Sequence, residues 1–435
     1  MSIIEILNTY LVGTCLPPFL LAAGLFFGVR LSFFPIRHPI RTVKKMGKGD
    51  LPSSLSALSV ALAGTLGVGN IAGVGLALSV GGAGAILWMI VGGMAVALLK
   101  YSEIALALDQ RQGESRGALD YIEPTLGRGA ALLFALLSLL LALSMGSLLQ
   151  GNVIAEAAAS FLSVHPLSVG LFLSAVTLLL FLGGRRAVER ITAVFIPGLT
   201  VLYTLAALVV VFVNITSLPS VVSRILCEAF SLKSAGGGLL GLGLVRGMRT
   251  GIQKGLFSNE AGAGTAPFAH GNASTPPAVQ GIFGIAEVLT DTVLMCTLTG
   301  VAILSAFPVL PSLSGTALVA AAFGTVFGEG AEAIVSLSII LFSYATVACW
   351  VSYGRTALGH LTVGRTGAVL FPACFLAALA VGPLVSPRGA WALADLVLGA
   401  MTFINTAALL KSRDRIRRIT EEAGLIDGAQ QKSRP

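Results

Sequence analysis

The chain has 435 residues, of which 55% are hydrophobic and only 11% are charged, and its formal net charge is +8. Soluble domains are about one quarter charged, so this composition excludes an ordinary soluble protein. Backbone groups find no water inside a bilayer, so the chain must cross it as helices or as a closed barrel. Barrel strands alternate apolar and polar residues, whereas this chain has long apolar runs such as 130–142 and 199–213. We therefore predict an all-α polytopic membrane protein.

Eleven segments approach the roughly 20 apolar residues that cross the hydrocarbon core. In chain order they are 10–32, 56–80, 84–108, 129–160, 166–183, 192–215, 236–258, 279–306, 333–359, 366–385 and 389–410. The first has no basic residue ahead of it and no small-residue cleavage site, so we interpret it as a retained span and not as a signal peptide.

Lysine and arginine mark the cytoplasmic loops of membrane proteins. One set of alternate loops, together with the tail, is basic: Arg37, Arg41, Lys44, Lys45, Lys48, Arg111, Arg116, Arg128, Arg185, Arg186, Arg190, Arg355, Arg365, Lys411, Arg413, Arg415, Arg417 and Arg418. The opposite loops contain only Arg224, Lys233 and Arg388. This asymmetry predicts eleven crossings of a bacterial inner membrane, with the N-terminus outside and the C-terminus in the cytoplasm. The same asymmetry accounts for the net charge of +8, so we expect no nucleic-acid partner.

Two segments outside the spans have amphipathic patterns. Residues 218–233 carry Arg224, Glu228 and Lys233 among apolar residues, and the tail from Lys411 alternates basic, acidic and apolar residues. Each fits either a short amphipathic helix or a solvated connection.

The second span contains four glycines and Asn70 within GTLGVGNIAGV (64–74). Glycine costs about 1 kcal/mol relative to alanine in a helix interior, so this cluster favours a local unwinding over a tightly packed crossing. Unwound backbone at this depth is tolerated where it lines a cavity. There, free carbonyl groups can bind a cation, and a half-helix N-terminus can bind a carboxylate.

The seventh span repeats this pattern. Five glycines lie within residues 235–243, and the span leads into the polar, glycine-punctuated stretch KGLFSNEAGAGTAP (254–267). The second and seventh spans are five helices apart, and five is odd, so two five-helix units would run in opposite directions. Broken helices in corresponding positions of inverted repeats indicate a transporter binding site.

Two carboxylates, Glu287 and Asp291, lie one turn apart in the eighth span. Acidic residues inside the membrane are functional candidates because they are costly to insert. We expect Glu287 to be protonated at neutral pH, or to pair with Arg246 or Arg249, either as a structural salt bridge or as part of a proton-coupling pair.

Several motifs together resemble the alanine or glycine:cation symporter family. They are GLFFGVRLSFF (24–34), GTLGVGNIAGV (64–74), GGAGAILWM (81–89), KYSE (100–103), GSLLQGNVIAEA (146–157), KGLFSNEAGAGTAP (254–267), TDTVLMCT (290–297) and CWVSYG (349–354). The resemblance implies an extra first helix followed by the 5+5 inverted repeat of the amino acid–polyamine–cation superfamily, with helices 2 and 7 broken. It also implies sodium-coupled uptake of alanine, glycine or a similar small neutral amino acid.

The resemblance also implies site residues. Those expected to bind substrate are Gly69, Asn70, Gly73, Gln150 and Trp350. The residues expected to bind sodium are Thr65, Gly67 and Thr346. Without the family, a structural hydrogen bond between helices explains Gln150 equally well. Residues expected to shape a gate or cap a helix, rather than touch substrate, are Ser258, Asn259, Glu260 and Arg249.

The predicted organisation is a first helix and basic loop (1–50), a first repeat (51–217), an external segment with the second repeat (218–410), and a cytoplasmic tail (411–435). No catalytic triad, phosphate loop or paired Cys/His spacing is present, so we expect a non-enzyme with no cofactor, using Na⁺ only as a coupling ion. The alternatives are a proton-coupled transporter of another small polar solute and a non-transporting sensor or channel. The tail is short for a signalling domain, and no pore-lining charge ring appears.

Overall fold

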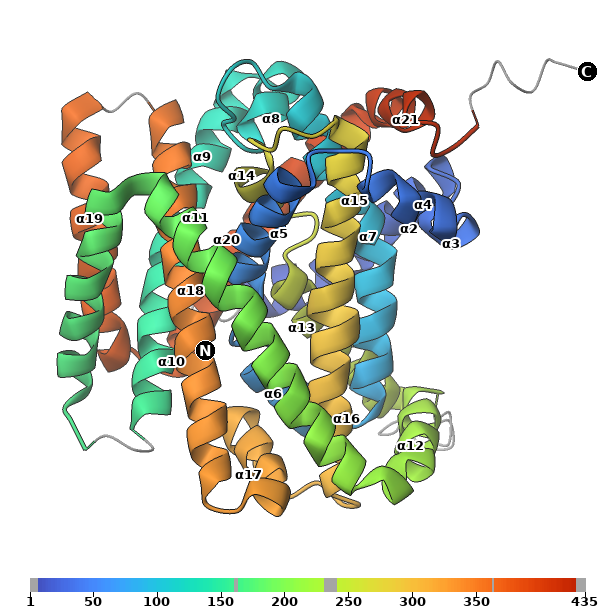
Figure 1. Ribbon diagram of the computed structural model, residues 1–435, viewed down its shortest axis with the longest axis vertical. Coiled ribbons are helices and arrows are strands. Elements are labelled where there is room, and N and C mark those ends of the chain that lie inside the picture. The colour runs from blue at the N-terminus through green and yellow to red at the C-terminus, as the bar shows by residue number, and fades with distance from the viewer. Residues whose placement is uncertain (1–6, 160–162, 231–240, 362–363, 428–435) are drawn as a thin grey trace, which may run out of the picture.

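The computed structural model describes residues 7–159, 163–230, 241–361 and 364–427. Every regular element in these ranges is helical, and the helices form one bundle (Figure 1). This confirms the all-α prediction.

The N-terminal half consists of the first helix, a basic connection and the helices up to residue 230. The elements are η1 (Asn8–Cys15), α2 (Leu16–Arg30), α3 (Phe34–Arg37), α4 (Pro39–Met46), α5 (Leu51–Thr65), η2 (Gly69–Gly73), α6 (Val74–Gly81), α7 (Gly84–Gln110), α8 (Leu119–Leu126), α9 (Arg128–Leu143), η3 (Ser144–Leu148), α10 (Leu149–Ala158), α11 (Pro166–Val213), η4 (Ile215–Ser217) and α12 (Leu218–Phe230).

The C-terminal half contains the remaining predicted spans and the tail. The elements are α13 (Gly241–Asn259), α14 (Ala266–His270), α15 (Pro277–Val288), η5 (Leu289–Cys296), α16 (Thr297–Ala306), α17 (Gly315–Phe327), α18 (Gly330–His360), α19 (Gly364–Val381), η6 (Gly382–Leu384), α20 (Pro387–Lys411) and α21 (Arg413–Glu422).

Within the described ranges, nine helices are long and apolar enough to cross a membrane, and the bent pair of α5 with η2 and α6 makes ten. The seventh predicted span, α13, is helical but is not among the ten. It contains Arg246, Arg249 and Lys254 within 19 residues, and such charges make a segment costly in lipid unless its polar groups face protein. The glycine-rich stretch 235–240 lies outside the described residues.

The structure corrects the predicted connection between the fifth and sixth spans. Residues 184–191, expected to be a loop, belong to the helical segment α11, which is interrupted only at Gly184 (φ 68°, ψ −167°). A positive φ is readily adopted by glycine because it has no Cβ, so the chain turns at one residue instead of through a loop.

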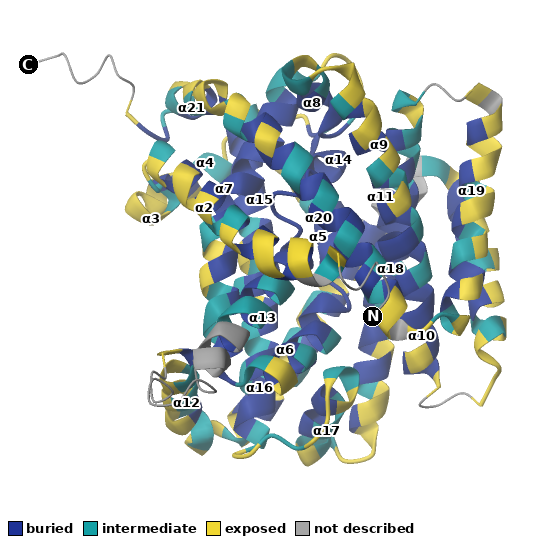
Figure 2. Cartoon of the chain, turned by 180° about the vertical axis from the view of Figure 1, so that it is seen from behind, coloured by how far each residue is buried: buried dark blue, intermediate teal, exposed yellow. Residues whose placement is uncertain are grey.

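Burial separates the centre of the bundle from its rim. In the most apolar 18-residue stretch of each helix, 72% of the residues are buried in α18 and 67% in α7. The corresponding share is 28% in each half of α11 and in α19. Figure 2 shows the exposed residues on the outer face of α19, and large apolar side chains such as Leu179, Leu182 and Phe212 are exposed on α11. Such an apolar outer surface is what a lipid environment requires.

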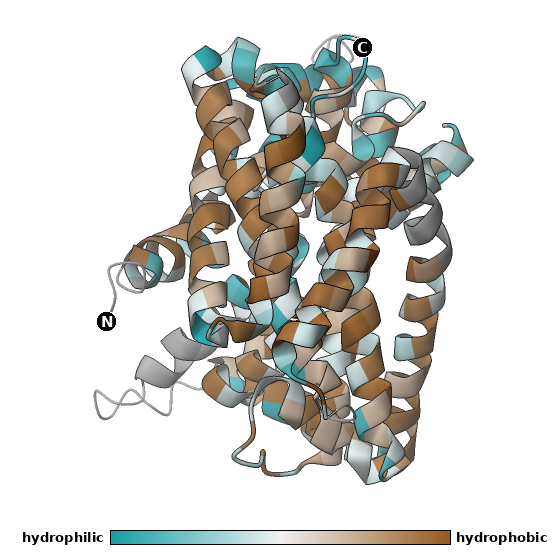
Figure 3. Ribbon diagram, turned by 90° about the vertical axis from the view of Figure 1, so that its left-hand side faces the viewer, coloured by the Kyte–Doolittle hydropathy of each residue, from teal (hydrophilic) through white to brown (hydrophobic). Residues whose placement is uncertain are grey.

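The two ends of the bundle differ in composition. The helices α4, α8 and α21 lie at one end, which we call the basic end, and α12 and α17 lie at the other (Figure 1). Figure 3 shows apolar residues over the middle of the bundle and hydrophilic residues gathered at the end that holds the C-terminus. The short helices α3, α4, α8 and α17 lie where only connections were expected.

Of the two alternatives left open for the tail, the structure shows the amphipathic helix, α21, which is docked on the bundle. Ile416 and Ile419 are buried, and the hydroxyls of Thr420 and Tyr101 are 2.9 Å apart. Ion pairs join Asp414 to Arg30 and Arg415 to Asp109. The helix therefore ties the first span to α7. The segment that begins at residue 218 is likewise helical, as α12, with Arg224 paired to Glu228 at 2.8 Å.

Candidate functional site

The second span is broken where its glycines cluster. Helix α5 ends at Thr65, Leu66 is extended (φ −69°, ψ 112°), and the chain becomes helical again at Gly69. The two halves are bent by 56°. This confirms the predicted unwinding.

Asn70 fixes this break to the eighth helix. Its Oδ1 accepts a hydrogen bond from the Gly67 amide at 3.0 Å. Its Nδ2 donates to the backbone oxygen of Asp291 at 2.9 Å and to the Asp291 carboxylate at 2.8 Å. The side chain is only 1% exposed. One amide thus caps the broken backbone and binds a buried acid.

Asp291 joins three helices at this point. Besides Asn70, its carboxylate accepts hydrogen bonds from the hydroxyls of Ser258 and Thr292, each at 2.9 Å. A Cβ built on Gly69 would lie 3.2 Å from the Ser258 Cα, so α13 passes directly against the break. The sequence placed Ser258 away from the substrate region, whereas the structure brings it beside Asn70.

The seventh helix is broken after Asn259. Glu260, Gly262 and Gly264 have φ values of 51°, 90° and 78°, in the left-handed region that glycine favours. The side chain of Asn259 stabilises the turn, because its Oδ1 accepts from the Ala261 amide at 2.9 Å and its Nδ2 donates to Thr292 at 3.0 Å. Asn259 therefore caps a broken helix, as expected.

A buried ion pair supports the second break. Lys100 Nζ lies 2.9 Å from Glu287 Oε1 and donates to the backbone oxygen of Asn259 at 2.6 Å. The other carboxylate oxygen of Glu287 is 3.3 Å from His270 Nε2, and Gln280 Nε2 is 2.7 Å from His270 Nδ1. All four side chains are buried.

This arrangement corrects the predicted partner of Glu287. The carboxylate pairs with Lys100 of α7, whereas Arg249 lies against Gly13 of η1. The side chain of Arg246 is outside the described residues. Although Glu287 and Asp291 are one turn apart, the π-helical segment η5 begins between them, and each belongs to a different cluster.

A further acid, Glu103, holds the turn that follows Asn259. Its Oε1 accepts from the Gly264 amide at 3.1 Å and from Asn405 of α20 at 2.7 Å. Asn405 also donates to the Gly262 carbonyl at 2.8 Å. Lys100 and Glu103 belong to the KYSE motif, but no role was predicted for either residue. The available signal was the presence of two charged residues within an apolar span.

Oxygen atoms gather where α5 ends. The Thr346 hydroxyl donates to the Ala63 carbonyl at 2.9 Å, and a Cβ built on Gly67 would lie 3.3 Å from the same hydroxyl. The Thr65 hydroxyl bonds within its own helix, to Ala61 at 3.2 Å. Thus Thr346 and Gly67 are neighbours. Hydroxyl and freed carbonyl oxygens of this kind suit a hard cation.

Gln150 and Trp350 provide two buried polar atoms without partners. Gln150 Nε2 donates to Met145 within its own helix at 3.0 Å, while Gln150 Oε1 and Trp350 Nε1 have no hydrogen bond within the described residues. No direct hydrogen bond joins either side chain to Asn70 in that part of the chain. Buried polar groups are usually paired, so these two atoms are candidates for contact with a small polar ligand.

Trp350 packs tightly against the π-helical segment η3. A Cβ on Gly146 would lie 2.3 Å from the Trp350 Cβ. Such π-helical segments are rare and often mark functional sites. Here, η2, η3 and η5 hold Asn70, Gly146 and Asp291, respectively.

We expect Gly146→Ala to lower uptake at least tenfold at equal protein amount, because the added methyl must displace Trp350 or the whole helix. Gly129→Ala is the matched control, since a Cβ there meets nothing within 4 Å. Initial uptake rates in vesicles, normalised to the amount of folded protein, measure the difference. Equal rates for both variants would show that the close packing of Gly146 against Trp350 is not needed for uptake.

A polar vestibule lies at the basic end of the bundle. Its inner part, about 180 Å³, is lined by Ser53, Ser56 and Asn272 with Phe268. An outer part of about 440 Å³ shares Val188 and Ser352 with it. An aromatic series follows from Phe268: its ring centroid is 5.5 Å from that of Tyr353, which is 5.2 Å from that of Trp350. The vestibule therefore ends at Phe268, and Tyr353 connects this ring to Trp350.

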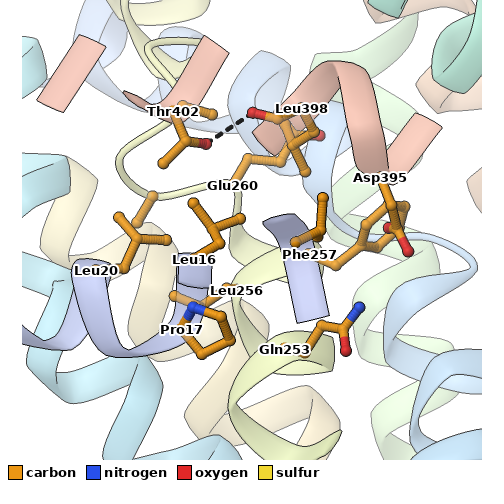
Figure 4. A pocket seen from close by; sticks show the side chains of 13 residues that line it. Leu16, Pro17, Leu20, Gln253, Leu256, Phe257, Glu260, Asp395, Leu398 and Thr402 are labelled. Carbon is orange, nitrogen blue, oxygen red and sulfur yellow. Dashed lines mark hydrogen bonds between the residues drawn. The ribbon is translucent and has the colours of Figure 1, made fainter. Parts of the chain in front are cut away.

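Glu260 lines a different, narrower pocket between α2, α13 and α20 (Figure 4). The volume is about 20 Å³, which holds about one water and no amino acid. Asp395 and Gln253 are the other polar groups facing it, together with Thr402, whose hydroxyl donates to Leu398 at 2.8 Å. Glu260 therefore lines no substrate-sized cavity here. No cluster of three metal-ligating side chains occurs among the described residues.

Comparisons with known proteins agree with this architecture. The profile described as "Sodium:alanine symporter family" matches residues 1–422. The sodium/alanine symporter AgcS of Methanococcus maripaludis is 33% identical, with 94% of each chain covered. The probable sodium/glutamine symporter GlnT of Bacillus subtilis is 32% identical over 94% of this chain and 87% of its own. The putative sodium/proton-dependent alanine carrier YrbD of the same species is 31% identical, covering 93% and 88%. The chain is a multi-pass membrane transporter, not an enzyme, and belongs to the sodium:alanine symporter family.

Proposed function

We propose that the chain carries a small neutral amino acid, alanine or glycine, together with Na⁺ by alternating access. The observation that carries the proposal is the break of the second helix, where Asn70 holds Asp291 at 2.8 Å and freed backbone lies beside Thr346. Relatives named as symporters of alanine and glutamine support an amino-acid substrate.

The substrate site is proposed at Gly69, Asn70, Gly73, Gln150 and Trp350. A half-helix N-terminus carries a partial positive charge and unpaired amides, so η2 suits the substrate carboxylate. Trp350 and Gln150 supply an apolar ring and the unpartnered polar atoms described above. The bulk of the Trp350 ring leaves little space in the proposed site, which favours substrates with small side chains.

The sodium site is proposed at Thr346, Gly67 and Thr65. The first two are supported by the proximity of the Thr346 hydroxyl to Gly67 and Ala63. Moving one cation across about 100 mV yields about 2.3 kcal/mol, and a tenfold ion gradient adds about 1.4 kcal/mol. Together these suffice for roughly several-hundred-fold accumulation of a zwitterion.

We propose that the basic end faces the cytoplasm of a bacterial cell, with the N-terminus outside and two inverted repeats, 51–217 and 218–410. The positive-inside rule supports this orientation. In this orientation the vestibule opens toward the cytoplasm, and we infer an inward-facing conformation in which Phe268, Tyr353 and Trp350 separate the vestibule from the break.

In this orientation, a cysteine introduced by Ser56→Cys should react with a membrane-impermeant maleimide only from the cytoplasmic side. The exposed cysteines Cys15, Cys227 and Cys374 must first be replaced. Ser220→Cys on α12 is the control at the opposite end and should react only from outside. Labelling of inside-out and right-side-out vesicles measures both, and reversed labelling would contradict the orientation.

A proton-coupled mechanism is the second candidate. It is favoured by the direct contact between the ionisable Asp291 and Asn70, and one relative is named as sodium/proton-dependent. Glu287 is a weaker candidate, because Lys100 already balances its charge.

Uptake of labelled alanine and glycine into proteoliposomes tests these proposals, with a sodium, potassium or proton gradient imposed in turn. Accumulation that requires inward sodium supports the first proposal. Accumulation driven by protons alone moves the coupling site to Asp291. Absence of uptake of both amino acids under every gradient would overturn the substrate assignment.

A further inference from the structure

The connection after the first span forms a strongly basic surface. Helices α3 and α4 border a hollow of about 650 Å³. We call it the α4 basic hollow. It is lined by His38, Pro39, Ile40 and five cationic side chains, and by no Asp or Glu: Arg37, Arg41, Lys44, Lys45 and Lys48. A concentration of positive charge without carboxylates attracts a polyanionic ligand.

Most of these cations lack protein partners. Arg37, Arg41, Lys44 and Lys48 are exposed and form no ion pair with any residue that the structure describes. Other basic residues at the same end are paired, as Arg415 is with Asp109 and Arg417 with Glu421. Most of the positive charge of the hollow is therefore not neutralised by acidic residues of the described chain.

Apolar side chains stand beside the charges and face away from the protein. Ile36, Ile40 and Val43 are 63%, 71% and 66% exposed. On the other face of α4, Thr42 is buried and Met46 packs against the core. An exposed apolar row next to a basic row is typical of a helix lying at the membrane interface.

The preceding helix places the hollow at headgroup depth. Helix α2 exposes Phe26 (39%) and Val29 (72%), as a lipid-facing span does, and it ends at Arg30, only a few residues before α3. Basic clusters directly beyond a span bind anionic lipids. Arginine can contact a phosphate through two N–H groups at once.

We infer that the α4 basic hollow binds the headgroup of an anionic phospholipid, with Arg37, Arg41 and Lys44 on the phosphate and Ile36, Ile40 and Val43 against the acyl region. Lys45 donates a hydrogen bond to the Ala423 carbonyl, so the bound headgroup lies beside the docked tail. The site is separate from the helix breaks and does not depend on which solute is carried.

The test is a lipid titration of the purified full-length protein, read as the thermal unfolding midpoint. Dioleoylphosphatidylglycerol is the anionic probe and dioleoylphosphatidylcholine the zwitterionic one. Wild type should be stabilised selectively by the anionic lipid. In Arg37→Gln/Arg41→Gln/Lys44→Gln the apparent affinity should fall about a hundredfold, at about fivefold for each charge. The matched control Arg413→Gln/Arg418→Gln, on exposed tail residues, should keep wild-type affinity.

A charge-conserving variant and a titration with inorganic phosphate complete the test. Arg41→Lys/Lys44→Arg keeps the charge and should keep the lipid selectivity even if the triple variant fails to fold. Equal stabilisation by both lipids in wild type, or full retention by the triple variant, would overturn the proposal. Equal protection by inorganic phosphate would show a free-anion site and would also overturn it.

Discussion

Asn70→Ala is expected to reduce amino-acid uptake about a hundredfold. The substitution removes the hydrogen bond that caps the broken backbone at Gly67 and both bonds to Asp291. Hydrogen bonds to a charged group are worth about 1.5–3 kcal/mol each, and about 2.8 kcal/mol corresponds to a hundredfold change. The measurement is the initial uptake rate in proteoliposomes at equal amounts of folded protein.

The control for this variant is Asn152→Ala. Asn152 is also a buried asparagine with two bonds to backbone carbonyls, but these belong to Gly382 and Val385, away from the break. It should lose thermal stability while keeping most of its uptake. Uptake in Asn70→Ala within threefold of wild type would refute a central role for the helix-2 break.

The second large effect concerns the buried pair Lys100–Glu287. Removing one partner of a buried pair leaves an uncompensated charge and costs about 3–5 kcal/mol. Lys100→Met and Glu287→Met should therefore each lower the thermal midpoint strongly. Lys100→Met also removes the hydrogen bond to the Asn259 carbonyl, which anchors the second helix break.

The double variant Lys100→Met/Glu287→Met should be more stable than Lys100→Met, because neither charge is then left alone in the core. A partly exposed pair at the surface, Arg417 with Glu421, is the control, and Arg417→Gln should cost only about 0.5 kcal/mol. A double-mutant cycle on the thermal midpoints gives the coupling energy. Additive effects of the two core substitutions would show that the pair is not energetically coupled.

Stability and uptake need not recover together in that double variant. A stable double variant without uptake would assign the pair a functional part in holding the Glu260–Gly264 turn. A stable and active one would make the pair purely structural. Either result distinguishes Glu287 from Asp291, which contacts Asn70 directly.

The sequence predicted the helix breaks because their cause is local. Four glycines around Asn70, and the alternation of polar residues and glycines after Lys254, disfavour a continuous helix wherever they lie in the fold. The prediction of a loop between the fifth and sixth spans was wrong, because basic residues do not by themselves determine the local backbone. Arg185, Arg186 and Arg190 suggested a loop, but helical backbone can carry basic side chains, and only Gly184 departs from helical geometry.

The site was predicted in part. Asn70 and Gly67 lie at the first break, within the glycine cluster that predicted it, and the Thr346 hydroxyl lies beside Gly67. The connection of Ser258 to Asp291 and the support from Lys100, His270 and Asn405 were not foreseen. His270 lies 17 positions from Glu287, whereas Ser258 lies 33 positions from Asp291 and Asn405 lies 302 positions from Glu103. Nothing in local spacing indicates which helix will face which.

By itself, then, the sequence determined the membrane environment, the helical class, the positions of the breaks and the family pattern. These follow from rules that act within one segment, above all the need of every backbone group in lipid for a hydrogen-bond partner. Only the tertiary structure decided that Glu287 pairs with Lys100 and not with Arg249, and that the tail docks against Tyr101. Such pairings depend on the relative rotation and depth of helices far apart in the chain, and the energy of a buried charge is set by whichever partner that packing brings within about 3 Å.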